Sequence, residues 1–207
     1  FKEMKFVMPD PNPDKSDMSD YLENSDIIDF EHPLVSQTAE ELTYGLKDNL
    51  SKAREIYKFT RDHIFNSIEI NATSVTKTAS EVLDKGHGIC FAKAHLLAAL
   101  MRASGIPAGF CYQVIYDEDL ERLVVHGFNG IYIKELDKWL RIDACLHPDV
   151  NDWEFDPFKE STVRSIRKEI GESDDLTVYH APNKKILKIL NAAETLEELI
   201  HLIPSEI

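Results

Sequence analysis

The sequence predicts a protein of the α+β class, with N-terminal helices packed on an antiparallel sheet. In the first half of the chain, apolar residues recur at the spacing of amphipathic helices. Between residues 108 and 144, three runs rich in Val, Ile, Tyr and Phe follow one another, separated by short polar turns. Helices that precede the strands, rather than alternate with them, favour the α+β class.

The helices of the first half have recognisable ends. We expect helices at residues 33–44, 51–65, 79–84 and 90–104. Pro33 suits a first helical turn, and Ser51 is a suitable cap for the second helix. The fourth helix is apolar on most of its sides, which predicts a central and buried position. Gly105 and Pro107 end it.

The strands come next, and two of them can be assigned a register. We expect strands at 108–116, 122–133 and 138–144, and helical segments near 160–171, 183–192 and 195–202. A four-residue hairpin loop after Ile133 pairs that residue with Lys138. His126 then faces Cys145, and Asp143 lies on the diagonal of the same face. This register therefore predicts that His126 and Asp143 are within hydrogen-bond distance.

The bulk composition excludes several classes of function. Of 207 residues, 43% are hydrophobic and 29% are charged, as in an ordinary globular protein. The net charge of −14 repels nucleic acid and anionic membrane surfaces, so we expect no nucleic-acid partner. No run of about 18 apolar residues is present, which predicts no membrane span.

The start of the chain differs from the rest in composition. Residues 1–31 hold nine Asp and Glu against three Lys, so residues 1–32 are expected to form an acidic, extended segment. Residues 33–207 are expected to form a single domain with a C-terminal helical extension. Three cysteines and no secretory segment favour a cytoplasmic protein with free thiols, although the chain begins at Phe1 and export stays open.

Cys90 is the first candidate for chemistry. It stands where a turn containing Gly86 and Gly88 enters a helix, so unpaired backbone N–H groups and the positive end of the helix dipole surround it. Both favour the thiolate, which is the nucleophilic form of cysteine. Taken alone, Cys90 fits a small buried core residue equally well.

His126 and Asp143 are the residues that would complete a catalytic set. A nucleophilic thiol needs a base, and the base needs an acceptor that orients its ring. Each residue also has an ordinary explanation, since a strand histidine is often a core residue and an aspartate after a strand is often a turn residue. The order of the three places the nucleophile on a helix and its two partners on adjacent strands.

Several motifs resemble those of the transglutaminase-like core of bacterial proteins. They are Ala79-Ser80-Glu81-Val82-Leu83, Gly88-Ile89-Cys90, Gly105-Ile106-Pro107-Ala108, His126, and Trp139 followed four residues later by Asp143. The resemblance covers roughly residues 27–145 and implies a papain-like cysteine proteinase fold. It implies that Cys90 attacks an acyl carbon, that His126 transfers the proton and that Asp143 holds the imidazole. The sequence has no Gly-rich phosphate loop after a strand, and no cofactor is expected.

Other residues are candidates for substrate binding. They are Gln113, Phe128, His87 and Trp153. The chain departs from the family pattern at Gln113, where a small residue is frequent, and at Phe128, where a tryptophan is common. These departures lie in strands that line the acyl site of the family, so they concern the substrate rather than the triad. His87 with Cys145 and His147 offers zinc-type ligands, but the spacing matches no familiar zinc pattern, so no metal is expected.

The sequence favours an enzyme that performs thiol-dependent acyl chemistry on amide bonds of a protein or peptide. Hydrolysis of a peptide or isopeptide bond is favoured over transfer to an amine, because nothing in the sequence marks an acceptor-lysine site. The alternative is a non-catalytic module that binds a protein or peptide on the same fold. The oligomeric state does not follow from the sequence.

Overall fold

The computed structural model of the protein describes residues 10–145 and 163–207 and has the predicted α+β fold. The helices are α1 (Pro33–Thr43), α2 (Asn49–His63), α3 (Ala79–Lys85), α4 (Cys90–Ala103), α5 (Lys184–Ala192) and α6 (Leu196–Leu202), with 3₁₀ turns η1 (Met18–Leu22) and η2 (Lys168–Ile170). The strands are β1 (Asn12–Pro13), β2 (Phe65–Asn66), β3 (His87–Gly88), β4 (Ala108–Asp117), β5 (Arg122–Ile133), β6 (Lys138–Ile142) and β7 (Ser173–Tyr179).

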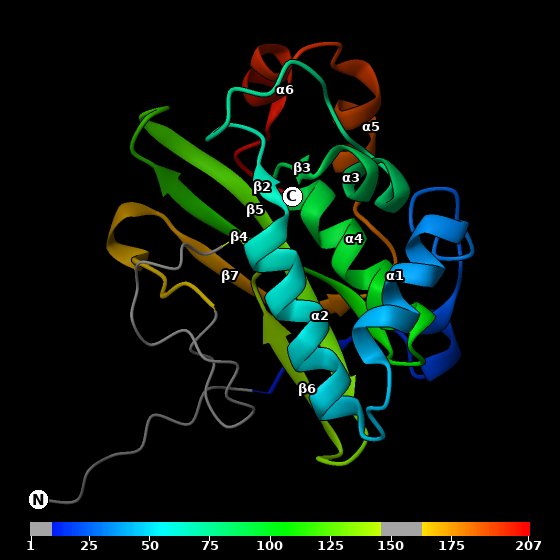
Figure 1. The fold of residues 1–207 in the computed structure, drawn as a ribbon. Helices are drawn as coiled ribbons and strands as arrows, with labels where there is room; N and C mark the ends of the chain where they lie inside the picture. Colours follow the sequence, from blue (N-terminus) through cyan, green and yellow to red (C-terminus); the bar gives the residue numbers. More distant parts are fainter. Residues whose placement is uncertain (1–9, 146–162) are drawn as a thin grey trace, which may run out of the picture.

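The main sheet has the strand order β1-β7-β4-β5-β6. Strands β7, β4, β5 and β6 are antiparallel to their neighbours, and β1 adds a short parallel pair at one edge. The predicted register between β5 and β6 is confirmed, since Ile133 pairs with Lys138 and Asn129 with Ile142. Strands β2 and β3 form a separate parallel pair, and α1, α2 and α4 gather on one side of the sheet (Figure 1).

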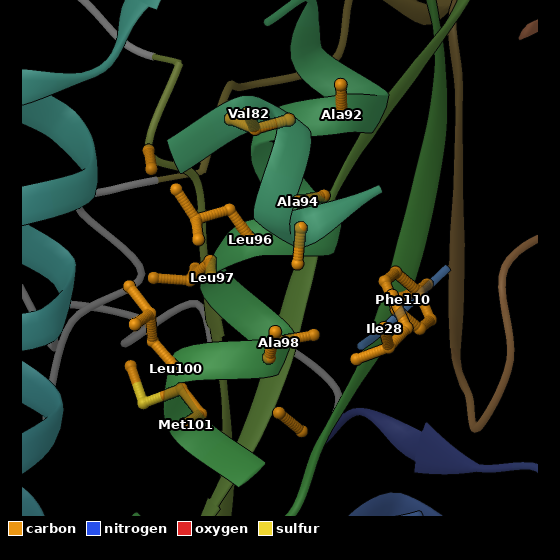
Figure 2. Close-up of a cluster of buried hydrophobic side chains, with 14 of the residues drawn as sticks. Ile28, Val82, Ala92, Ala94, Leu96, Leu97, Ala98, Leu100, Met101 and Phe110 are labelled. Carbon is orange, nitrogen blue, oxygen red and sulfur yellow. The ribbon is translucent and has the colours of Figure 1, made fainter. Parts of the chain in front are cut away.

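The core is built around α4, as its apolar sequence predicts. Ala92, Leu96, Leu97, Ala98 and Leu100 are fully buried, and Figure 2 shows their side chains radiating from α4 toward its neighbours. Each fully buried leucine contributes roughly 1.5–3 kcal/mol of hydrophobic stabilisation. The first turn of α4 is therefore held by the core beneath it, which fixes the position of Cys90.

Residues of β5 alternate between the two faces of the sheet. Asn129 faces α4, since its Nδ2 donates to the backbone of that helix at 3.0 Å. Gly127 faces α4 as well, because a Cβ there would lie 2.6 Å from Phe91. His126 and Phe128 belong to the opposite face. That face carries a second buried cluster of Tyr21, Cys111, Phe128, Trp139 and Val178.

The described part of the acidic segment packs against the body of the protein. Tyr21 and Ile28 are fully buried. The Tyr21 hydroxyl lies 2.8 Å from Asp14 Oδ1 and 3.1 Å from the carbonyl of Val178, which ties η1 to β7. Acidic side chains around these two anchors stay at the surface, so a strongly charged segment still supplies apolar residues to the core.

Two local predictions are wrong. The predicted helix at 160–171 is present only as η2, within the part of that range that the structure describes, and β7 after it was not predicted. The predicted cap Ser51 is replaced by Asp48, whose carboxylate accepts from the Ser51 backbone N–H at 2.8 Å. Aspartate caps at least as well as serine, so the helix begins earlier than expected.

None of the helices in the described ranges is long and apolar enough to cross a bilayer.

Candidate active site

Cys90 is the first residue of α4 and is partly exposed. The chain reaches it from α3, which ends at Gly86 in the left-handed conformation with φ 71°. The other α-helices have side-chain caps at their N-termini, whereas α4 has Ile89 at this position and no such cap. Its first backbone N–H groups and the positive end of its dipole are therefore directed at whatever occupies the space beside Cys90.

His126 and Asp143 are in direct contact. His126 Nε2 lies 2.6 Å from Asp143 Oδ2, and the two side chains are 12% and 2% exposed. The other carboxylate oxygen, Oδ1, accepts from the backbone N–H of Cys145 at 2.8 Å. The Tyr57 hydroxyl donates to the carbonyl of Asp143 at 3.3 Å. Both oxygens and the backbone of Asp143 are thus held in place, which fixes the carboxylate toward the imidazole.

The Cys90 side chain lies near enough to the imidazole of His126 to contribute to the raised pKa of that ring. Because Nε2 faces Asp143, the nitrogen left for Cys90 is Nδ1. Strand β6 ends at Ile142, so no residue of β6 pairs with His126, whose strand neighbour is on the β4 side alone. The structure thus brings together the three residues that the sequence predicts.

The pKa of His126 is raised well above its ordinary value. Burial alone would lower this pKa, because it disfavours the charged ring. The Asp143 carboxylate and the hydrogen bonds to Asp143 and Cys90 act more strongly in the other direction. The protonated imidazolium is the form that stabilises a thiolate beside it.

Phe128 lies against the His126 ring rather than in an open cleft. The two rings stack with their centroids 5.9 Å apart and an interplanar angle of 19°. On Phe128, the guanidinium of Arg141 lies 5.7 Å from the ring centre and is itself paired with Asp174 at 2.7 Å. Phe128 is 2% exposed, so its position is that of a support for the imidazole.

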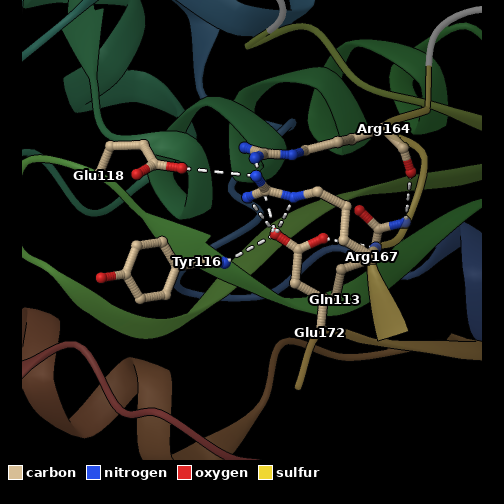
Figure 3. Close-up of polar contacts among 6 residues, drawn as sticks. All are labelled: Gln113, Tyr116, Glu118, Arg164, Arg167 and Glu172. Carbon is tan, nitrogen blue, oxygen red and sulfur yellow. Dashed lines mark hydrogen bonds and ion pairs between the residues drawn. The ribbon is translucent and has the colours of Figure 1, made fainter. Parts of the chain in front are cut away.

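Gln113 pairs directly across the sheet with His126. Its side chain is buried, and Nε2 donates to the carbonyl of Arg164 at 3.1 Å, as Figure 3 shows. Its Oε1 has no hydrogen-bond partner among the residues that the structure describes. Gln113 therefore attaches the segment around Arg164 to the strand next to His126.

His87 is buried within the loop structure that precedes Cys90. Its Nδ1 lies 2.8 Å from Ser67 Oγ, and its Nε2 lies 3.4 Å from Ser74 Oγ. Burial and the charge of Lys85 lower the pKa of His87, which favours the neutral ring. The contacts of this histidine are those of a loop anchor. Trp153, the remaining substrate-binding candidate, lies outside the described residues.

The sequence placed Cys145 opposite His126, but it did not identify Tyr57 and Lys93 as neighbours of the site. Burial and the Asp143 carboxylate raise the pKa of the Cys145 thiol, so Cys145 remains a neutral thiol, and the charge of Lys93 opposes this shift. Lys93 follows Cys90 by one helical turn and is 4% exposed. The one sequence feature that could have pointed to Lys93 is its place as a lysine in the otherwise apolar run of α4.

Within the described ranges, no three His, Cys, Asp or Glu side chains are arranged to hold a metal ion.

A sequence model of the family described as the transglutaminase-like superfamily matches residues 36–144, which include Cys90, His126 and Asp143. No curated protein matches the chain. Among solved structures, a protein from Cytophaga hutchinsonii described as a candidate cysteine protease is similar, with 21% identity and a TM-score of 0.52. The match covers 63% of this chain and 42% of that protein.

The periplasmic domain of TgpA from Pseudomonas aeruginosa is also similar, with 20% identity and a TM-score of 0.44 over 60% of this chain and 45% of that domain. The chain thus spans less than half the length of either structure. At 21% identity, the similarity to the Cytophaga protein shows a shared fold and nothing further.

Proposed function

Because the chain belongs to the transglutaminase-like superfamily, we propose that it performs thiol-dependent acyl chemistry on amide bonds, with Cys90, His126 and Asp143 as a catalytic triad. One observation carries the proposal. The His126 ring, which is 12% exposed, lies 2.6 Å from a fixed carboxylate oxygen of Asp143, and its pKa is raised by both Asp143 and Cys90. This is the arrangement that a nucleophile, a base and an orienting acceptor require.

In the first half of the reaction, the Cys90 thiolate attacks the carbonyl carbon of an amide. The negative charge that develops on the carbonyl oxygen is stabilised by the uncapped N–H groups at the start of α4. The His126 imidazolium gives its proton to the departing amine, and the C–N bond breaks. The products are a free amine and a thioester between the acyl group and Cys90.

In the second half, a nucleophile must reach that thioester. We propose that it is water, activated by the now neutral His126, so that the products are a carboxylic acid and free Cys90. The substrate class is a peptide or isopeptide bond. No feature of the described residues suggests a second site for an amine acceptor, which supports hydrolysis over transfer.

The test uses an amide-linked peptide library and three variants, Cys90→Ala, His126→Ala and Asp143→Asn. We expect the parent chain to release amine and acid in equal amounts, and Cys90→Ala to release neither. Addition of a primary amine at millimolar concentration separates hydrolysis from transfer, since transfer would replace the acid with a new amide. A folded parent chain that binds peptide without any release of amine would support a binding module instead and contradict the proposal.

A further inference from the structure

An exposed apolar loop lies beside the candidate nucleophile. We call residues 65–71 the rim loop. Its Phe65, Ile68 and Ile70 are 59%, 45% and 46% exposed. Across the described residues, eight large hydrophobic side chains are at least 36% exposed, and three of them fall within these seven positions. Scattered exposed apolar residues are ordinary, whereas a local concentration indicates a binding surface.

The backbone of the rim loop is fixed by its own hydrogen bonds. The Ile68 N–H donates to Asn66 Oδ1 at 2.9 Å, and the Ala72 N–H donates to the carbonyl of Ser67 at 2.9 Å. Asn71 closes the turn in the left-handed conformation with φ 49°. A fixed loop holds its apolar side chains in water, at a cost that a flexible loop would avoid by folding them inward. The exposure is therefore built into the loop.

The rim loop is attached to the segment that leads into Cys90. In the β2–β3 pair, Asn66 is the register partner of Gly88, and the Ser67 N–H donates to the Gly88 carbonyl at 3.2 Å. The buried pair of Ser67 and His87, at 2.8 Å, locks the same contact. Gly88 is two residues before Cys90. Neighbouring strands lie about 4.8 Å apart, so the loop backbone runs within one strand spacing of the approach to the nucleophile.

The negative charge of Glu69, in the rim loop, contributes to the raised pKa of the Cys145 thiol, and Cys145 follows Asp143 by two residues. The rim loop is thus hydrogen-bonded to the segment that leads into Cys90 and acts through its charge on a residue close to Asp143. Its exposed apolar side chains therefore belong to the loop that adjoins the segment leading into Cys90.

We propose that Phe65, Ile68 and Ile70 form the wall of a specificity subsite, which binds a bulky aliphatic or aromatic side chain of the polypeptide substrate. The inference rests on the proposed function, because the occupant is the chain whose acyl carbon Cys90 attacks. An extended peptide advances about 3.3 Å per residue, so side chains one to three residues from the scissile carbonyl reach the rim loop. The apolar surface favours the apolar side chains among them, because their burial releases water from both surfaces.

The test measures the rate at which peptidyl acyloxymethyl ketones alkylate Cys90. Two probes differ only in carrying Leu or Ser two residues before the reactive group. We expect the parent chain to react at least about tenfold faster with the Leu probe, as a filled apolar subsite permits. In Ile68→Ser and Ile70→Ser that ratio should fall to about threefold or less. Ile170→Ser is the matched control, since Ile170 is 42% exposed on η2, and it should keep the full ratio.

Iodoacetamide, which occupies no subsite, separates failure of this inference from failure of the proposed function. Its rate at Cys90 should be the same in the parent chain and all three variants. An equal rate for the two probes in the parent chain, or an unchanged ratio in both rim variants, would overturn the inference while iodoacetamide still labels Cys90. If the rim variants change the oligomeric state of the protein but not the probe ratio, the rim loop is a contact between copies of the chain. That result would also overturn the inference. A folded chain whose Cys90 resists every reagent would contradict the proposed function and the subsite together.

Discussion

The imidazole of His126 has three kinds of neighbour, and each constrains it differently. The Asp143 carboxylate fixes its orientation through a 2.6 Å contact, and the Phe128 ring stacks on one of its faces. Cys90 is the neighbour left for the second ring nitrogen, Nδ1. A ring held on these sides has little freedom to turn away from the thiol, which is what proton transfer between two fixed atoms requires.

The substitution Asp143→Asn tests the electrostatic part of this arrangement. Asparagine keeps an acceptor oxygen but removes the negative charge, so the pKa of His126 should fall from its raised value. The imidazolium, which exists below that pKa, is then lost at a lower pH. Titration of the histidine ring carbons by NMR checks this. The control is His95, whose pKa of about 4 is set by burial and should not change.

The same variant makes a kinetic prediction. Because the ring keeps an orienting acceptor, turnover in Asp143→Asn should fall less than the roughly 10²–10⁴-fold expected when a general base is removed, as in His126→Ala. Initial rates with one amide substrate compare the two. A folded Asp143→Asn variant as inactive as Cys90→Ala would show that Asp143 does more than orient the imidazole.

The sequence predicted that His126 and Asp143 lie close together, because side chains alternate between the two faces of a strand and the length of the hairpin loop sets the register. The same reasoning did not reveal that Phe128 stacks on His126, although residues two apart on a strand share a face. Tyr57 could not be predicted, because it comes from α2 and its contact with Asp143 depends on how that helix packs on the sheet.

At Gly127, the ring of Phe91 from α4 packs directly on the backbone of β5. A Cβ there would lie 2.6 Å from Phe91, the residue after Cys90. The close approach presses the first turn of α4 onto the strand that carries His126. The distance between the candidate nucleophile and its base therefore depends on a glycine that takes no part in the chemistry.

Gly127→Ala should lower the reactivity of Cys90 by displacing the first turn of α4. We expect iodoacetamide to alkylate Cys90 more slowly in this variant at pH 6, with all three triad residues intact. Gly130→Ala is the matched control, since a Cβ there meets Val178 at 2.7 Å on the opposite face of the same strand. It should destabilise the chain to a similar extent but leave the alkylation rate of the folded protein unchanged. Equal slowing in both variants would contradict this account.

Elements with strong local patterns were predicted well, and those that depend on distant partners were not. Helix α4 and strands β4 and β5 consist of long apolar runs, so periodicity alone identifies them. Strand β7 begins Ser173-Asp174-Asp175, a composition typical of turns. It becomes a strand because it pairs with β4, more than fifty residues earlier in the chain, which no local pattern records.

At the scale of the whole molecule, a buried carboxylate fastens the segment before β7 to the sheet (Figure 3). Glu172 Oε1 accepts from the Tyr116 N–H at 3.0 Å and pairs with Arg167 at 2.8 Å. Burial alone would raise the pKa of Glu172, but the hydrogen bonds from Arg167 and Tyr116 lower it to about 2. Glu172 thus joins the segment around Arg167 to β4, the strand in which Gln113 pairs with His126.

Glu172→Gln should lower the free energy of unfolding by on the order of 2 kcal/mol at neutral pH, because hydrogen bonds to a charged group are lost. The folded pKa lies below the ordinary value of 4.5, so the contribution is complete above that pH and disappears as the pH falls toward about 2. Urea unfolding from pH 7 to 2 should therefore show the parent and the variant converging. Glu118→Gln removes an exposed partner of Arg167 at 3.5 Å and should change the free energy by about 0.5 kcal/mol or less.

The formation of a covalent acyl-enzyme on Cys90 tests the central claim most directly. The parent chain is mixed with a peptide amide substrate, quenched in acid within the first turnover, and examined by intact and peptide mass spectrometry. The account predicts a mass increase equal to the acyl group, carried by Cys90 as a thioester that hydroxylamine removes. The adduct should be absent in Cys90→Ala and form slowly in His126→Ala. Turnover without any acyl adduct, or an adduct carried by Cys111 or Cys145, would contradict the claim.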